Sequence, residues 1–180
     1  YLNHAGFNTL SNPHGILFNP LSVTKSMDAY VNCEHKNAAD LFYLNELWNS
    51  WDHHTRFSNI DKERALSEMN ASIDKAHAFI KQCDWLIITL GSAFQYHLVE
   101  NKYPVANNHR APGQWFEKEL LSIATIQQSL AESIEKVKAI KKSEIHKNTP
   151  LSVLSLLYPV YCSLIFLSPS LFICSLSQTE

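Results

Sequence analysis

The apolar run at residues 85–96 (WLIITLGSAFQY) constrains the fold of this chain more than any other segment. The run is unbroken until Gly91, and a hydroxyl side chain, Ser92, follows directly. In an open α/β sheet, a fully apolar run of strand length is a buried strand, and the turn at its carboxyl end faces the ligand. The sequence therefore predicts a central strand over residues 85–90 and a site at the turn that follows it.

Two amphipathic helices are predicted on either side of this strand. Apolar residues recur at three- and four-residue steps over residues 62–83, and Asn59 or Asp61 can cap that helix. A second helix is predicted over residues 125–142, with apolar residues on one face and lysines in its last turns. Helix, strand, loop and helix in this order indicate an α/β layer fold. Residues 11–61 read as loops with short helices, in which Asn12-Pro13 and Asn19-Pro20 mark tight turns.

The composition favours one globular domain and excludes several classes of partner. The chain has 180 residues, of which 46% are hydrophobic, and its formal net charge of -2 offers no electrostatic footprint for nucleic acid or an anionic membrane surface. Four cysteines without a CxxC pair favour reduced thiols in a cytoplasm and predict neither a disulfide framework nor a metal site. No signal peptide is visible and no cofactor motif occurs, so we expect no metal and no cofactor.

The last 33 residues differ in composition from the rest, because residues 148–180 carry a single charge, Glu180. Three interpretations stay open for this tail: a transmembrane helix over residues 151–175, buried strands with turns at the prolines, or a segment that is not the native continuation of the domain. Pro159 and Pro169 argue against the helix, and the missing alternation of apolar and polar residues argues against strands. We therefore expect a domain at residues 1–147 and a separate tail at residues 148–180.

The turn after the predicted strand supplies the first candidate site. A glycine at the carboxyl end of a central strand lets a backbone N–H approach a substrate oxygen, and the hydroxyl of Ser92 can add a donor. The structural alternative is that Gly91 only makes the turn and Ser92 only caps the next segment.

The second candidate is residues 48–58 (WNSWDHHTRFS). An Asp-His-His run, here Asp52, His53 and His54, can bind a metal or pair a carboxylate with an imidazole. The residues before it do not form an apolar strand, which argues against a metal. We therefore favour a structural role, with Trp48 and Trp51 in the core and one histidine bound to a loop carbonyl.

The third candidate is residues 105–112 (VANNHRAP), in the loop after the predicted strand. Asn107, His109 and Arg110 suit the binding of a carboxylate or the orientation of an acyl group, and an ordinary loop explains them equally well.

These segments, in this order, resemble the GSCFA family. Residues 2–23 contain the family's Asn-Pro-x-Gly and Asn-Pro-Leu-Ser elements, and residues 48–58 resemble its Trp-rich block, with residues 54–57 in place of a His-Ser-x-Phe element. Residues 86–96 resemble the family's strand and Leu-Gly-Thr-Ala turn, and residues 105–112 resemble its Val-Ala-Asn-x-His segment. The resemblance covers nearly all of residues 2–142.

The resemblance implies an α/β fold of the SGNH-hydrolase type, with three α/β/α layers and a central parallel sheet. It also implies an ester hydrolase whose substrate is a small-molecule acyl ester or a carbohydrate ester. By position, Gly91 and Ser92 fall on the oxyanion side of such a site, although Ala93 and Phe94 replace two polar residues of the template. The substrate-binding candidates are His54, Arg56, Asn107 and His109, which in a binding module without catalysis would hold a sugar or acyl ligand.

Several expected segments are absent from the 180 residues. The chain contains neither the Gly-Ser-Cys-Phe-Ala motif with the presumed nucleophile nor the family's Ser-Pro-Val-Arg and Asp-x-x-His-Pro segments. We therefore expect an incomplete SGNH-like fold and no turnover by this chain alone. The alternatives are a ligand-binding module without catalysis and a protein anchored in a membrane through residues 151–175.

Overall fold

The computed structural model describes residue 4 and residues 6–143, 152–157 and 171–176. Its largest sheet has four strands in the order β1-β9-β4-β8: β1 (Phe7–Ser11), β9 (Leu171–Leu176), β4 (Trp85–Leu90) and β8 (Ser152–Leu157). The predicted apolar strand is β4, and it lies inside the sheet with Leu86, Ile88 and Leu90 buried. The prediction of a central buried strand is confirmed.

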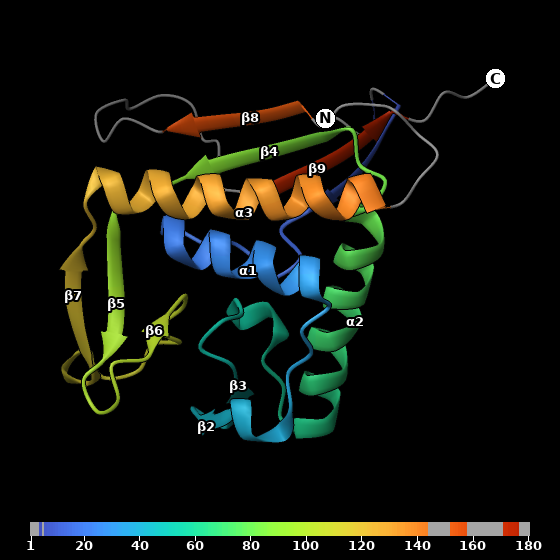
Figure 1. The fold of residues 1–180 in the computed structure, drawn as a ribbon. Helices are drawn as coiled ribbons and strands as arrows, with labels where there is room; N and C mark the ends of the chain where they lie inside the picture. Colours follow the sequence, from blue (N-terminus) through green and yellow to red (C-terminus); the bar gives the residue numbers. More distant parts are fainter. Residues whose placement is uncertain (1–3, 5, 144–151, 158–170, 177–180) are drawn as a thin grey trace.

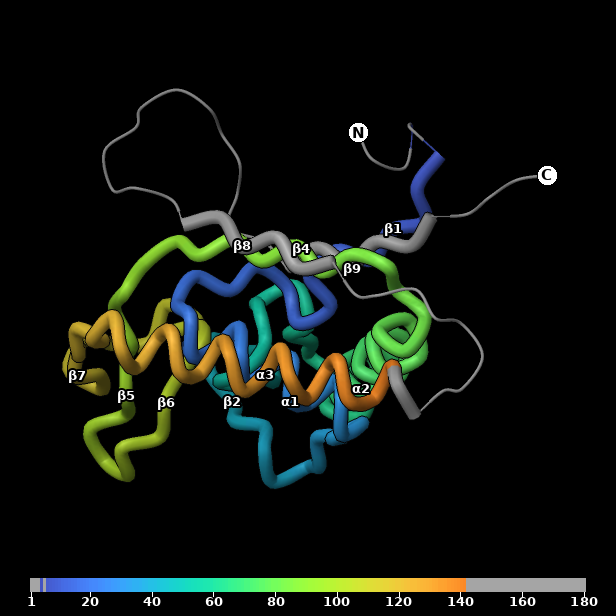
Figure 2. Tube along the Cα trace, turned by 45° about the horizontal axis from the view of Figure 1, so that its top comes forward, coloured from blue at the N-terminus to red at the C-terminus, as the bar shows by residue number. Residues whose placement is uncertain are grey.

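Three helices lie together on one face of this sheet: α1 (Pro20–Asn32), α2 (Lys62–Ile80) and α3 (Ile123–Ser143) (Figures 1 and 2). Both helices predicted from periodicity are present with nearly the predicted bounds. The side chain of Asp61 caps α2 by accepting a hydrogen bond from the Arg64 N–H at 2.9 Å. The apolar face of α3 packs against α1 and the main core through Val137 and its neighbours.

Helix α1 is longer and more deeply packed than the short helices expected over residues 11–61. Asn19-Pro20 begins a 13-residue helix instead of a tight turn. The Asn19 side chain accepts a hydrogen bond from the Ser22 N–H at 2.8 Å, and Pro20 occupies the first turn, where its missing N–H is not needed. Val23, Met27 and Tyr30 then bury one face of the helix in the main core.

The α/β class is confirmed, and the sheet is mixed instead of parallel. β4 pairs with β8 in parallel, but β9 lies between β1 and β4 and is antiparallel to both. In the described part of the chain, helices cover one face of the sheet, so the described architecture has two layers where three were expected (Figure 2).

The described parts of the tail are two strands, β8 and β9, which agrees with the interpretation of residues 148–180 as strands. The other tail residues lie outside the described ones. Among the described residues, no helix combines the length and the apolar character that crossing a membrane requires.

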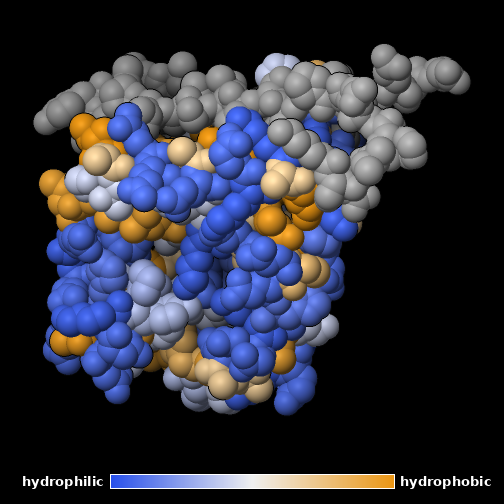
Figure 3. Space-filling view, in the orientation of Figure 1, coloured by the Kyte–Doolittle hydropathy of each residue, from blue (hydrophilic) through white to orange (hydrophobic). Residues whose placement is uncertain are grey.

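Smaller elements surround the layers and carry most of the loops of interest. A second, antiparallel sheet has the order β6-β5-β7, formed by β5 (Phe94–Leu98), β6 (Pro104–Val105) and β7 (Phe116–Leu120). β2 (Phe42–Leu44) and β3 (Leu47–Asn49) form a hairpin, and the short 3-10 helices are η2 (Ala38–Asp40), η3 (Thr55–Phe57) and η4 (Gly113–Trp115). The face seen in Figure 3 is mostly hydrophilic, in keeping with the exposed polar side of α3.

Candidate functional site

A cleft lies at the carboxyl end of β4, where α/β proteins usually bind ligands. Its volume is about 260 Å³. Residues of the turn after β4, the second sheet, the loop after β6 and the start of α1 line it: Phe18, Asn19, Ser92, Phe94, Tyr96, Val105, Ala106, Asn107 and Asn108. The lining therefore combines amides and a hydroxyl with aromatic rings, and it contains no charged side chain.

The turn after β4 is held by one backbone carbonyl, that of Phe18 in the loop before α1. The N–H groups of Gly91 and Ser92 both donate to the Phe18 carbonyl, at 3.0 and 2.9 Å. In this conformation neither N–H points at a substrate oxygen, so the donor that the turn can offer the cleft is the Ser92 hydroxyl. Its Oγ accepts the Phe94 N–H at 3.2 Å, which leaves the hydroxyl hydrogen to donate elsewhere.

The loop that carries Asn107 also lines the cleft. The N–H groups of Ala106 and Asn107 donate to the Trp51 carbonyl at 2.8 and 3.3 Å. The Asn107 Oδ1 accepts the His109 N–H at 2.9 Å. Because its carbonyl oxygen is held by the backbone, the Asn107 side chain keeps its NH₂ group for a ligand.

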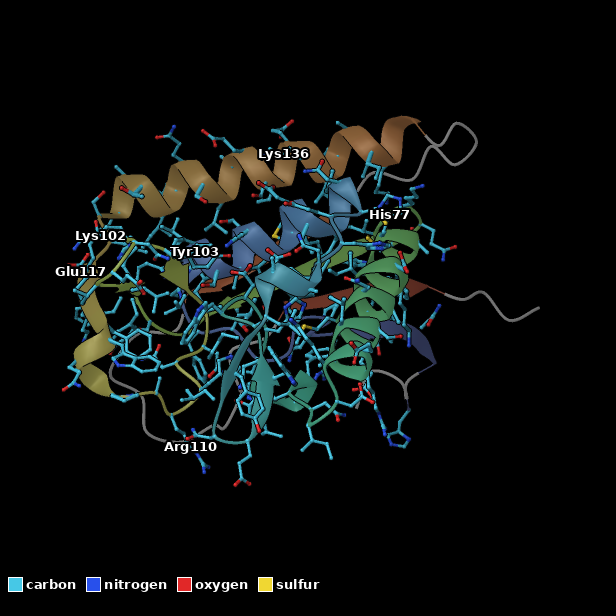
Figure 4. All side chains as sticks on the ribbon, turned by 90° about the horizontal axis from the view of Figure 1, so that it is seen from below. His77, Lys102, Tyr103, Arg110, Glu117 and Lys136 are labelled. Atoms are coloured by element: carbon cyan, nitrogen blue, oxygen red, sulfur yellow. The ribbon has the colours of Figure 1, made fainter. Side chains whose placement is uncertain are left out.

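His109 lies behind this loop, outside the cleft. The side chain is buried, with Nε2 2.7 Å from the Ser50 carbonyl oxygen and Nδ1 3.4 Å from the Thr55 hydroxyl. Burial lowers its pKa, so the ring is neutral at pH 7 and ties two loops together. Its neighbour Arg110 is exposed and lies at the outer edge of the molecule (Figure 4).

His54 and Arg56 also lie outside the cleft, at the start of η3. His54 Nδ1 accepts the Arg56 N–H at 3.2 Å. The Arg56 guanidinium donates to the carbonyl of Asn12 at 2.8 Å and so ties this segment to the loop after β1. Of the residues proposed from the sequence, the structure brings Ser92 and Asn107 together and places His54, Arg56 and His109 in the supporting loops.

An ion network centred on the buried Asp52 lies next to the cleft. Asp52 Oδ1 is 2.7 Å from the Lys25 ammonium, and Oδ2 is 2.6 Å from that of Lys36. The Tyr103 hydroxyl donates to Oδ2 at 2.8 Å, while the adjacent Lys102 points outward to Glu117 (Figure 4). Burial alone would raise the pKa of Asp52, but the two ammonium groups outweigh it and lower the pKa below its usual value.

This network borders the cleft through one small residue. Ala106 lines the cleft and also a cavity of about 30 Å³, which Lys25, Lys36 and Asp52 line from the other side. A shift of the network would therefore reach the cleft wall. No motif in the sequence connects the two lysines and Tyr103 with Asp52, because they come from α1 and from two separate loops.

Two buried histidines are stacked beside the network. The rings of His14 and His53 lie 4.0 Å apart at an interplanar angle of 14°. His14 Nδ1 is 2.8 Å from the Tyr30 hydroxyl, and His53 Nδ1 is 3.2 Å from the Ser50 hydroxyl. The buried His53 Nε2 has no hydrogen-bond partner among the described residues. Asp52 and His53 thus face different neighbours and do not converge as metal ligands.

Because the two stacked histidines are buried, we expect the protein to lose stability in mild acid. Burial lowers the pKa of His14 to about 3, with the nearby Asp52 opposing and Lys36, Lys25 and Arg56 adding to the shift, and burial also lowers the pKa of His53 well below 6.5. Both rings are neutral when folded but gain a proton when unfolded below about pH 6.5. Stability is therefore complete above that pH and falls as the pH decreases toward 3. Each histidine should cost about 2 kcal/mol at about pH 5.

Urea denaturation at several pH values between about 7 and 5 measures this loss. In His53→Gln, the free energy of unfolding should fall less steeply with decreasing pH, because about one proton fewer is taken up on unfolding. This holds whatever the effect of the substitution on stability at neutral pH. An unchanged slope in that variant would show that His53 is not held neutral.

A sequence model described as the GSCFA family matches residues 1–147. Searches of curated proteins and of solved structures found no match.

Proposed function

This chain belongs to the GSCFA family, and we propose that its domain acts in ester hydrolysis, with the cleft at the carboxyl end of β4 binding an acyl or carbohydrate ester. The observation that carries the proposal is the cleft of about 260 Å³ in which Ser92 and Asn107 face the same space. The proposal assigns substrate binding, and not the chemical step, to these two residues.

The lining favours a neutral sugar ester over a charged ligand. The rings of Phe18, Phe94 and Tyr96 offer apolar faces for a sugar ring. The Asn107 amide and the Ser92 hydroxyl can donate to an ester carbonyl or to sugar hydroxyls. Asn19 adds little, because its side chain is already engaged by Ser22 at the start of α1.

We assign supporting roles to the candidates outside the cleft. Arg56 ties the loop after β1 to η3, and His109 ties the loop of Asn107 to Ser50. His54 stays with this group, because its Nδ1 fixes the first turn of η3. Through these contacts, the three residues hold the cleft wall in place and do not need to touch the ligand.

Calorimetric titration with acetylated oligosaccharides tests the cleft. Because each side chain supplies one hydrogen bond, Asn107→Ala and Ser92→Ala should each weaken binding by about tenfold. Asn45→Ala is the matched control, because the Asn45 amide also contacts the His109 loop but lies outside the cleft lining. Equal affinities for all three variants would place the ligand elsewhere.

A ligand-binding module without catalysis is the second candidate. It is favoured by the Gly91 and Ser92 N–H groups, which are held by Phe18 and would need to be released before they could stabilise an oxyanion. Release of acetate from the same oligosaccharides separates the two functions. Binding without release supports the module, whereas release that depends on Asn107 supports the hydrolase.

A further inference from the structure

Three side chains able to bind a metal meet on the surface between the end of α1 and the middle of α2. Cys33 Sγ is 3.9 Å from His35 Nε2 and 3.4 Å from Asp74 Oδ1. His35 Nε2 and Asp74 Oδ1 are 2.6 Å apart. Among the described residues, this is the group of histidine, cysteine and acidic side chains whose ligand atoms converge, all within 4.8 Å of one another.

The backbone around the three side chains is held in place. Asn70, one turn before Asp74 on α2, accepts the Lys36 N–H at 2.8 Å and donates to the Lys36 carbonyl at 2.9 Å. The segment from Cys33 to Lys36 is thus fixed to the same helix that supplies Asp74. At the other end, the Cys33 N–H donates to the Ala29 carbonyl at the end of α1.

We propose that Cys33, His35 and Asp74 bind one zinc ion, with solvent as the fourth ligand. A thiolate, an imidazole and a carboxylate together suit Zn²⁺ better than Mg²⁺ or Ca²⁺, which prefer oxygen ligands alone. Tetrahedral zinc places its ligand atoms about 3.5 Å apart, so the His35 and Asp74 atoms need to separate by only about 1 Å. The exposed position leaves the fourth side of the ion open to water.

The site is independent of the cleft and of the proposed function. Sequence spacing gave no sign of this site, because the third ligand, Asp74, lies 41 residues after Cys33. His77 lies one turn after Asp74 beside α1 (Figure 4), but its Nδ1 is 2.7 Å from the Tyr30 carbonyl oxygen, so it is a neighbour of the site and not a ligand.

The same contacts disfavour a reactive cysteine. Partial burial and the Asp74 carboxylate raise the pKa of the Cys33 thiol, so without a metal the group is a thiol and not a nucleophilic thiolate. When zinc binds, sulfur forms the bond to the metal and the thiol proton passes to solvent.

Cobalt and zinc titration of the full chain tests the proposal. Co²⁺ should bind with one ion per chain and give the absorption of a thiolate-to-cobalt charge transfer, and Zn²⁺ should displace it and raise the thermal midpoint. Cys33→Ser should remove the absorption, and Asp74→Asn and His35→Ala should each weaken zinc binding by about tenfold or more.

His97→Gln is the control, because His97 lies in β5, far from α2 in Figure 1, and should leave binding unchanged. Cys33, His35 and Asp74 are partly or fully exposed, so their variants should fold. Cobalt absorption that persists in Cys33→Ser, or zinc affinity that is equal in the wild type and all three variants, would overturn the proposal.

Discussion

Gly15→Ala should destabilise the protein by about 3 kcal/mol, the largest effect expected of a single added methyl group. A Cβ at residue 15 would lie 2.1 Å from the Cβ of His54 and 3.3 Å from its Cα. The backbone of Gly15 also has φ +87°, a region that strains any L side chain.

The two segments cannot easily move apart to make room for the methyl group. The His54 N–H donates to the His14 carbonyl at 2.8 Å, and the Gly15 N–H donates to the Asn12 carbonyl at 2.8 Å. A shift large enough to clear the clash would break one of these bonds and disturb the stacked ring of His14.

Two other glycines separate the causes of the loss. Gly6 also has a positive φ, +83°, but open space around it, so Gly6→Ala should cost about 1 kcal/mol from strain alone. Gly113 has neither feature, and Gly113→Ala should change stability by less than about 0.5 kcal/mol. Urea denaturation measures all three, and a loss for Gly15→Ala no greater than that for Gly6→Ala would refute the steric contact with His54.

The spacing of apolar residues along the chain was enough to predict the strand and the two helices that bury one face against the core. The strand at residues 85–90 and the helices α2 and α3 follow from apolar spacing, because burial against the core imposes that spacing directly. The start of helix α1 was interpreted as a turn because Asn-Pro occurs both in turns and at helix starts, and only the buried face of Val23 and Met27 decides between them.

Pairing between distant strands could not be read from the sequence. The antiparallel place of β9 depends on partners in β1 and β4 that are more than 80 residues away, and an apolar serine-rich segment without alternation fits several registers. The α/β class was therefore predictable, whereas the mixed order of the sheet was not.

The candidate site shows the same limit. The sequence pointed to Ser92 and Asn107, which follow the predicted strand, and both line the cleft. His54, Arg56 and His109 were proposed with them, but their side chains contact other loops. Lys25 and Lys36 were not singled out, since a lysine on a helix or in a loop is usually solvated and only the fold turns these two toward Asp52.

Asp52→Ala should destabilise the protein by about 3 kcal/mol at neutral pH. Removal of the carboxylate leaves the Lys36 ammonium, whose side chain is only 13% exposed, without its counter-charge. Tyr103 also loses the acceptor of its hydroxyl. Ala106 lines both the cleft and the cavity beside this network, so a disturbed network should shift the cleft wall. Oligosaccharide binding should therefore weaken in the same variant.

Asp28→Ala provides the matched control. Asp28 pairs with Lys136 at 2.6 Å between α1 and α3, and it also accepts a hydrogen bond from the Ser133 hydroxyl at 3.1 Å. Both charged groups of this pair reach solvent, so its loss should cost only about 1 kcal/mol. Lys136 is labelled in Figure 4. Equal losses for the two variants would show that burial adds nothing to the Asp52 network.

A double-mutant cycle separates the charge of Asp52 from its packing. If the cost of Asp52→Ala is an uncompensated ammonium, then Lys36→Met in the same chain should recover part of it, with a coupling energy of about 1–3 kcal/mol.

The pH dependence of stability gives an independent check. A carboxylate with a lowered pKa contributes stability above its unfolded pKa of 3.8, and this contribution is lost only as the pH falls through the lower folded value. The difference between wild type and Asp52→Ala should therefore stay constant between about pH 6.5 and 5, where His14 and His53 already weaken the fold. A difference that grows as the pH falls from about 6.5 to 5 would mean that Asp52 acts by favouring a protonated histidine instead of by holding the two lysines.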